Sequence, residues 1–330
     1  LLFEEAYSTS HITIPAHLSL FTGLHPYNTG VLFNGARSLL DARIPTIGSY
    51  FQEKGYDTRA ITSARFLNTH LFGCSFNTVL HPTSLLSHSA EHTVNAFENM
   101  LKVKNYASGD KPFLTWLHFW DPHSPYDPPE EHRLQFGQEK ESALVKRLCR
   151  SDAQSQDLLS QNEKELVETT LGDGDILSLR ARYEGEIHYM DSQLQRVFDS
   201  LKSRGLYDNT VIVLMADHGE SLNDNGTKWA LHQHVYEHVV RVPLLIKHPD
   251  YKARRVPGLV QSIDIVPTIL NWENLQGDFD GKDLDTLVMH NTPLRDKVFL
   301  TRGNGIQTGS SDGKSKFIFT GIRKNPIAIP

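Results

Sequence analysis

The sequence predicts an α/β fold in which a mostly parallel central sheet has helices on both faces and a small C-terminal subdomain follows. Three observations lead to this prediction. The apolar run Val211–Ala216 is uninterrupted, as is typical of a strand buried on both faces of a parallel sheet. The run Pro112–Phe119 has the same character. The segment Ile44–Lys54 is amphipathic, ends at Gly55 and precedes a short strand, an order that is typical of βαβ units.

Predicted helices and strands alternate along the first half of the chain. Pro15 suits the first position of a helix, so we expect a helix over Ala16–Thr22 that Gly23 ends. Thr13 then lies just ahead of a helix N-terminus, a place that favours an anion such as phosphate or sulfate. The other elements predicted here are the helices Ile44–Lys54 and His92–Lys102 and the strands Arg59–Thr62 and Pro112–Phe119.

The second half begins with a polar, weakly periodic stretch from Glu130 to Leu177, which we interpret as a surface excursion with short helices. A long helix over Tyr183–Arg204 follows. Its core-facing residues recur every three or four positions: Ile187, Met190, Leu194, Val197, Phe198 and Leu201. We also expect strands at Val211–Ala216 and Arg241–Ile246, a helix at Val260–Asn271, and a small C-terminal sheet containing Val298–Leu300 and Phe317–Phe319.

Composition restricts the class of partner. The 330 residues carry a formal net charge of −6, which gives no reason to expect nucleic acid or an anionic membrane surface as a partner. No apolar run approaches the roughly 20 residues that a membrane span needs. The opening residues Leu1–Glu5 have the character of the middle of a fold, so we expect the chain to be a segment of a longer protein.

Three segments carry residues suited to chemistry. Asp217 and His218 end the Val211–Ala216 run, and an oxygen beside an imidazole nitrogen is a common pair of metal ligands. His123 lies in a proline-rich loop after the run that ends at Phe119. Because ligands bind at the carboxyl ends of strands in open α/β sheets, we expect these residues to meet Thr13 at one sheet edge. A divalent ion there would polarise a tetrahedral anion and favour the alkoxide of a bound hydroxyl.

The order of these motifs resembles the sulfatase family of the alkaline phosphatase superfamily. The resemblance covers nearly the whole chain and includes Leu20–Gly23, Gly55–Tyr56, Asp121–His123, Asp217–Glu220 and Arg241–Leu244. It implies the α/β fold predicted above, a catalytic domain over residues 1–290 and the start of a small subdomain over 291–330. It also implies a first strand that lies upstream of this chain.

The resemblance implies a role for each matching residue. Thr13 takes the nucleophile position, where sulfatases usually have a Cys or Ser that is converted to formylglycine. Threonine does not allow this conversion, and Thr-type relatives use the hydroxyl directly. His123 matches the histidine that contacts the anion or leaving group. His232, with His234 as the rival position, matches an anion-binding residue, and Asn34 matches a substrate-binding asparagine.

The resemblance also implies one divalent metal ion, Ca²⁺, Mn²⁺ or Zn²⁺. Asp217, His218 and Thr13 match ligands, whereas the one or two Asp ligands of the family's first strand are expected upstream of Leu1. The residues present are too few for tight binding of a hard ion, which takes about six oxygens.

The predicted function is hydrolysis of a sulfate or phosphate ester of a small molecule, glycan or lipid. A phosphoethanolamine-type transferase or phosphodiesterase, and an inactive binding domain, are the alternatives. Individual residues also have structural interpretations. Thr13 suits a helix N-cap, and His123, His232 and His234 suit loop positions.

Overall fold

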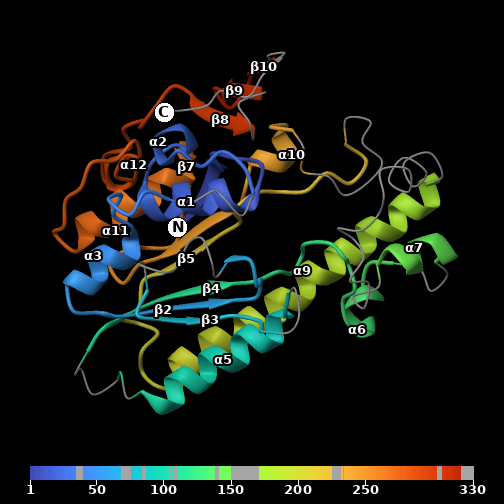
Figure 1. Cartoon of the computed structure of the whole chain (residues 1–330), viewed down its shortest axis with the longest axis horizontal. Coiled ribbons are helices and arrows are strands. Elements are labelled where there is room, and N and C mark those ends of the chain that lie inside the picture. The colour runs from blue at the N-terminus through green and yellow to red at the C-terminus, as the bar shows by residue number, and fades with distance from the viewer. Residues whose placement is uncertain are drawn as a thin grey trace.

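The structure is a computed structural model. It describes residues 1–34, 40–67, 76–83, 87–104, 106, 111–137, 141–149, 171–224, 232, 234–302 and 307–320. Among these residues the strands form three sheets (Figure 1). The first has the order β5 (Ile212–Met215), β6 (Leu244–Lys247), β1 (Leu2–Tyr7), β7 (Arg255–Gln261). The second has the order β3 (Thr78–Leu80), β2 (Asp57–Thr62), β4 (Phe113–His118), and the third β10 (Lys316–Thr320), β9 (Gln307–Ser311), β8 (Val298–Arg302).

Helices cover both sides of the first two sheets, which confirms the predicted α/β class (Figure 1). The β3-β2-β4 sheet is parallel throughout. In the other sheet β1 runs parallel to β7, whereas β6 is antiparallel to both β1 and β5, so this sheet is mixed. The helices are α1 (Thr13–Thr22), α2 (Pro26–Thr29), α3 (Ile47–Glu53), α5 (Ala90–Val103), α6 (Glu130–Arg133), α7 (Ala143–Leu148), α9 (Asp173–Lys202), α10 (Glu237–Val240), α11 (Ile265–Trp272) and α12 (Asp285–His290).

Local sequence explains where the helices near the site begin and end. Helix α1 ends at Gly23, which adopts the left-handed conformation that glycine allows without strain. Helix α3 begins with Thr46 as N-cap, and Ser49 completes the capping box. Helix α1 itself starts at Thr13, three residues before the predicted start, so Thr13 occupies the first helical position.

One predicted helix differs in extent, and one strand was not predicted. The expected helix Val260–Asn271 is wrong at its start, because Val260 and Gln261 still pair with β1 as the end of β7. Pro267 lies in the first turn of α11, where its missing N–H leaves no helical hydrogen bond unmade. The N-terminal strand β1 was not predicted, because Glu4 and Glu5 interrupt its apolar pattern.

Helix α9 begins ten residues earlier than predicted and buries a different face in its first half. Ile187, predicted to face the core, is 40% exposed, whereas Glu186 and Tyr189 are buried. Val197 and Leu201 face the core as predicted. The first half of α9 packs against α6 and α7, and its second half packs against α5, so two different surfaces decide which residues are buried.

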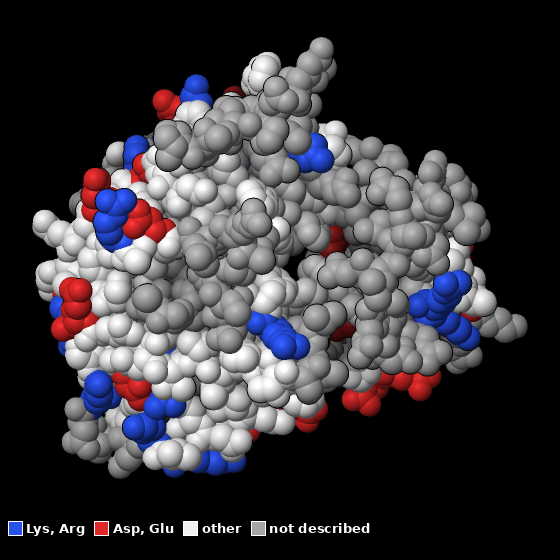
Figure 2. Space-filling view, in the orientation of Figure 1, with Lys and Arg blue, Asp and Glu red and all other residues white. Residues whose placement is uncertain are grey.

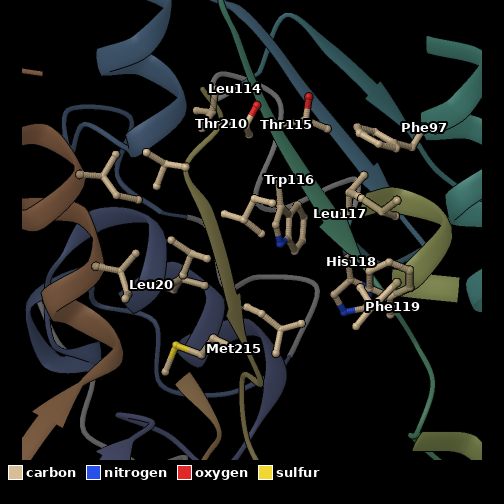
Figure 3. A pocket seen from close by; sticks show the side chains of 18 of the residues that line it. Leu20, Phe97, Leu114, Thr115, Trp116, Leu117, His118, Phe119, Thr210 and Met215 are labelled. Atoms are coloured by element: carbon tan, nitrogen blue, oxygen red, sulfur yellow. The ribbon is translucent and has the colours of Figure 1, made fainter. Parts of the chain in front are cut away.

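A cavity of about 1170 Å³ lies between β4 and β5 (Figure 3). Each of these strands is at the edge of its own sheet and is half-buried. The prediction that both strands are buried on both faces is therefore wrong, because each pairs with one neighbouring strand and lines the cavity. In Figure 3 the side chain of Trp116 projects from β4 toward β5, with Leu20 and Met215 beyond it.

The C-terminal sheet contains both predicted strands, with β9 between them. Its inner face packs against Tyr7, Val235 and Val240 through Leu300 and Ile318. On the face shown in Figure 2, basic and acidic side chains of the described residues are interspersed. Among the described helices, none is both long enough and apolar enough to cross a membrane.

Candidate active site

The three predicted segments meet at one end of the cavity. Thr13 from α1, His123 from the loop after β4, and Asp217 and His218 from the end of β5 all line it. Strands β1 and β5 point in the same direction because β6 is antiparallel to both, so α1, which follows β1, begins at the edge where β5 ends. The sequence prediction that these residues share one cleft is thus consistent with the structure.

The Thr13 hydroxyl and the Asp217–His218 pair are within contact distance. Thr13 Oγ1 lies 3.4 Å from His218 Nε2, and His218 Nε2 lies 3.5 Å from Asp217 Oδ2. His218 Nδ1 is 2.9 Å from the carbonyl oxygen of Gly219. Because a carbonyl only accepts, this contact assigns the proton to Nδ1 and leaves the lone pair of Nε2 facing Thr13.

Gly219 is required here by a close backbone approach. A Cβ atom at this position would lie 2.2 Å from the carbonyl oxygen of His238. The Gly219 amide donates to the carbonyl of Val239 over 2.6 Å. The turn after β5 is therefore held against the start of α10, and this contact places His218.

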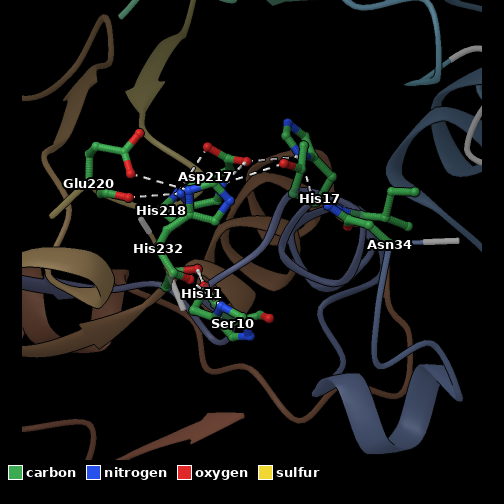
Figure 4. Close-up of polar contacts among 12 residues, drawn as sticks. Ser10, His11, His17, Asn34, Asp217, His218, Glu220 and His232 are labelled. Carbon is green, nitrogen blue, oxygen red and sulfur yellow. Dashed lines mark hydrogen bonds and ion pairs between the residues drawn. The ribbon is translucent and has the colours of Figure 1, made fainter. Parts of the chain in front are cut away.

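His232 and Glu220 extend the site beyond His218 (Figure 4). His232 Nδ1 lies 3.2 Å from Glu220 Oε1, and the His232 ring is 4.5 Å from that of His218. The ring of His123 follows at 5.7 Å from His232. The Nδ1 atom of His123 donates to the Ser124 carbonyl over 2.6 Å. Three imidazoles therefore form a row that starts beside Thr13.

Burial and neighbouring charges shift the pKa values in this row in different directions. Burial pushes the Asp217 carboxyl toward neutrality, but His218 and His17 outweigh it and hold its pKa at about 2. Burial lowers the pKa of His218 and of His123. Burial also acts against the charged form of His232, yet the hydrogen bond that His232 donates to the Glu220 carboxylate raises the pKa of His232 above its usual value. His232 is thus the imidazole of the row that is best suited to carry a positive charge.

Sequence reasoning missed three histidines. His17 donates from Nδ1 to the Thr13 carbonyl over 2.8 Å and lies 3.5 Å from Asp217 Oδ2 (Figure 4). His118 packs 5.3 Å from the His17 ring, and His11 Nδ1 contacts the carbonyl oxygen of His232. The i, i+4 spacing of Thr13 and His17 on one helix was the signal that could have identified His17.

Asn34 and His234, which were predicted to bind substrate, contact other residues of the chain. Asn34 Oδ1 accepts the Ile14 amide over 2.8 Å, so Asn34 caps the first turn of α1. His234 packs 5.1 Å from the ring of Tyr236. Pro15 has no N–H, and with the Ile14 amide occupied the helix N-terminus offers an anion fewer donors than the sequence suggested.

The donor atoms at Thr13, Asp217 and His218 suit part of a metal shell. A carboxylate oxygen, an imidazole nitrogen with its lone pair toward the cleft, and a hydroxyl converge within 3.5 Å of one another along the row. Within the described part of the chain, no group of three or more His, Cys, Asp or Glu side chains is arranged to hold an ion. Thr13, Asp217 and His218 together therefore fit a divalent cation as some of its ligands, and not as a complete set.

Comparison with known proteins gives the family of the chain. A family model described as Sulfatase matches residues 1–275. The chain is 24% identical over 315 residues to the uncharacterized sulfatase YidJ of Escherichia coli K12, covering 83% of this chain and 61% of that protein. It is 27% identical over 228 residues to an arylsulfatase of Clostridium perfringens, covering 66% of this chain and 44% of that protein.

Among solved structures, the phosphonate monoester hydrolase of Agrobacterium radiobacter superposes with a TM-score of 0.75 at 20% identity, over 97% of this chain and 80% of that one. Of the two curated relatives named above, the YidJ sulfatase and the arylsulfatase, the chain spans less than two thirds of the length. The fold, the ordered motifs and the family match over most of its length together show that this chain belongs to the sulfatase family.

Proposed function

We propose that the protein hydrolyses sulfate or phosphate esters with Thr13 as nucleophile. The observation that carries the proposal is the position of the Thr13 hydroxyl, 3.4 Å from His218 Nε2 at the end of the cavity. Thr13 is only 6% exposed, so its hydroxyl faces the cleft rather than bulk water. The functions named for the sulfatase and phosphonate hydrolase relatives support the same reaction class.

In this proposal each residue of the site has its own role in the reaction. Thr13, whose hydroxyl lies beside His218 Nε2, attacks the sulfur or phosphorus as the bond to the leaving oxygen breaks. Water then attacks the group carried by Thr13, which releases sulfate or phosphate and restores the hydroxyl. His232, kept protonated by Glu220, holds the negative oxygens and donates the proton that the leaving oxygen needs. His123 is neutral because burial lowers its pKa, so it contacts the leaving group rather than supplying the proton. Asn34 holds the first turn of α1, and His234 remains a candidate for substrate contact.

Asp217, His218 and Thr13 would hold a divalent cation, and Ca²⁺, Mn²⁺ and Zn²⁺ are the candidates. When bound, such an ion polarises the ester and favours the alkoxide of a coordinated hydroxyl. We also propose that residues 1–290 form the catalytic domain and that 291–330 begin a small subdomain. The end of the family match at residue 275 and the start of the C-terminal sheet at Val298 support this division.

An ester-hydrolysis assay on the full-length protein tests the proposal. Aryl sulfate, aryl phosphate and aryl phosphonate monoesters separate the substrate classes. Thr13→Ala and Asp217→Ala are expected to lower kcat by roughly 10³-fold or more, as for the loss of other nucleophiles. Thr13→Ser retains a hydroxyl, and Thr292→Ala at an exposed position is the matched control. Undiminished turnover in both Thr13→Ala and Asp217→Ala would refute the proposal.

The same assay distinguishes the transferase alternative. Adding glycerol or another alcohol as acceptor diverts the group from water if the enzyme is a transferase, and the product is then an ester of that alcohol. Chelation followed by addition of single metals tests the cation, because turnover is expected to fall and to return with one of the three. Turnover that persists through chelation contradicts the metal dependence.

A further inference from the structure

The segment that carries His123 is held against helix α9 by two buried side chains. We call residues 121–129, between β4 and α6, the His123 loop. Arg182 of α9 is 8% exposed and donates from Nη1 to the Tyr126 carbonyl over 2.9 Å. One turn later, Glu186 is 5% exposed and accepts the Asp127 amide on Oε1 over 2.6 Å. Arg182 and Glu186 therefore bind adjacent residues of the loop, Tyr126 and Asp127.

The residue between them, Gly185, allows the backbones to approach. A Cβ there would lie 3.0 Å from Pro128 and 3.1 Å from the Cα of Arg133. Glycine destabilises the interior of a helix relative to alanine, so its presence within α9 has a packing reason. Gly185 lets the end of the loop and the start of α6 lie directly on α9.

Glu186 also meets a second buried acid, Asp121, at the start of the loop. Both carboxyl groups are buried, and the charge of Asp121 acts on Glu186 at close range, so the two acids are stable together only when one of them carries a proton. Asp121 Oδ2 is buried, and no ordinary donor among the described residues reaches it. Burial raises the pKa of both groups, and repulsion from Asp121 raises that of Glu186 further. A proton on Glu186 provides the missing donor and removes the repulsion.

The loop in turn joins α9 to the row of imidazoles. His123 follows Asp121 by two residues, and its amide donates to the Trp120 carbonyl over 2.7 Å. Its ring packs 4.0 Å from that of Trp120. Tyr126 is 1% exposed, and burial together with the nearby charge of Glu220, the partner of His232, raises the pKa of its hydroxyl. A displacement of the His123 loop therefore moves both His123 and Tyr126, which lies near Glu220.

We propose that Glu186 and Asp121, which share one proton, are positioning residues that hold the His123 loop on α9 and thereby place His123 in the site. The expected effect on turnover rests on the proposed ester hydrolysis, whereas the pairing of Glu186 with Asp121 does not depend on it. Neither residue contacts the reacting atoms. When the pair loses its proton, two buried carboxylates repel each other, and the loop loses one of its attachments to α9.

Other charged or titratable groups face the pair from every element packed against it. They are Asp127 and His123 from the loop, Arg182 and Tyr189 from α9, Glu91 from α5, Arg133 from α6, and Glu141, which binds Arg182. Arg182 is already bonded to Glu141 and Asp127, and it does not neutralise the Asp121–Glu186 pair. The remaining acids favour the protonated form of Glu186.

The first test measures thermal unfolding of the full-length protein between pH 5 and pH 9, the interval between the ordinary and the raised pKa of Glu186. A group whose pKa is raised by folding stabilises the fold at low pH and loses that contribution as the pH rises. In Glu186→Gln the amide accepts from Asp127 and donates to Asp121 at every pH. The Tm of Glu186→Gln minus that of the wild type is therefore expected to increase steadily with pH. Glu184→Gln, an exposed neighbour on the same helix, is the control and is expected to show a constant difference. A constant difference for Glu186→Gln as well would overturn the pairing.

The second test follows the position of His123 without any substrate. Because burial holds the pKa of His123 below its usual value, an NMR titration of the His123 ring reports whether the loop is in place. In Glu186→Ala this pKa is expected to move up toward the ordinary value, and in Glu186→Gln to stay low. An unchanged His123 titration in Glu186→Ala would refute the positioning role, even if the protein is less stable.

The third test is catalytic. If the full-length enzyme hydrolyses an ester, Glu186→Ala is expected to lower kcat/KM at least tenfold at neutral pH. Glu186→Gln is expected to restore it and to remove the part of the alkaline loss that comes from ionisation of the pair. Wild-type activity in Glu186→Ala contradicts the inference, whereas a wild type that hydrolyses no ester contradicts the proposed function and leaves the first two tests to decide the pairing.

Discussion

Replacing Gly219 by alanine tests whether the turn after β5 sets the geometry of the site. The added Cβ would lie 2.2 Å from the carbonyl oxygen of His238. Since non-bonded heavy atoms need well over 3 Å, the backbone of one segment has to move by roughly 1 Å. Overpacking of this kind costs roughly 1–3 kcal/mol of unfolding free energy. A displacement of about 1 Å at reacting groups costs on the order of 100-fold in rate.

The expected result for Gly219→Ala is therefore a loss of roughly 1–3 kcal/mol in urea unfolding and a loss of about 100-fold in kcat/KM, measured on the full-length protein. The matched control is Gly174→Ala, in the first turn of α9, where a Cβ meets no atom within 4 Å. This control is expected to keep full activity and to gain up to about 1 kcal/mol. If Gly219→Ala keeps both the stability and the turnover of the wild type, the close approach does not position His218, and the reasoning is refuted.

Three further predictions concern single contacts. Glu220→Gln removes the charge that raises the pKa of His232, so the alkaline limb of kcat/KM is expected to shift to lower pH by about 1–2 units, and a pH–rate profile with an unmoved limb would contradict this. Asn34→Ala removes the cap of α1 and is expected to cost about 1 kcal/mol of unfolding free energy in urea. Asn34→Asp keeps an acceptor for the Ile14 amide and is expected to stay within about 0.5 kcal/mol of the wild type. Equal losses in both variants would count against the capping role. Arg295→Ala leaves the fully buried Asp264 without its partner and is expected to cost roughly 3–5 kcal/mol, so a loss below about 1 kcal/mol in the same measurement would show that the pair contributes little.

The strength of the α9 inference is that backbone geometry and hydrogen bonding support it independently of any titration. Gly185 marks the close approach, and Arg182 and Glu186 bind the loop on either side of it. A buried polar pair of this kind fixes one arrangement, because each alternative leaves an unsatisfied group. The precision of His123 in the site then depends on a helix that contributes no reacting atom.

The sequence alone was sufficient for those features that depend on local pattern. The apolar run Val211–Ala216 predicted β5, and the glycine after Thr22 predicted the end of α1. The pairing of Asp217 with His218 follows from their adjacency at a strand end. Because parallel strands end at the same edge, the meeting of this pair with Thr13 could also be predicted, and the 3.4 Å contact agrees with it.

The tertiary structure decided what local pattern does not encode. An interior strand and an edge strand have the same apolar composition, so the sequence could not show that β4 and β5 border a cavity. Periodicity assigned Ile187 to the core, yet packing on α6 buried the acidic Glu186 instead, since the Asp127 amide of the His123 loop binds its carboxyl group. Residues far apart in the chain, such as His17 and Asp217, become neighbours only when the sheet edge brings them together. The roles of His17 and Asp217 depend on burial and on the partners that burial provides. The order of the residues in the sequence does not encode either of these.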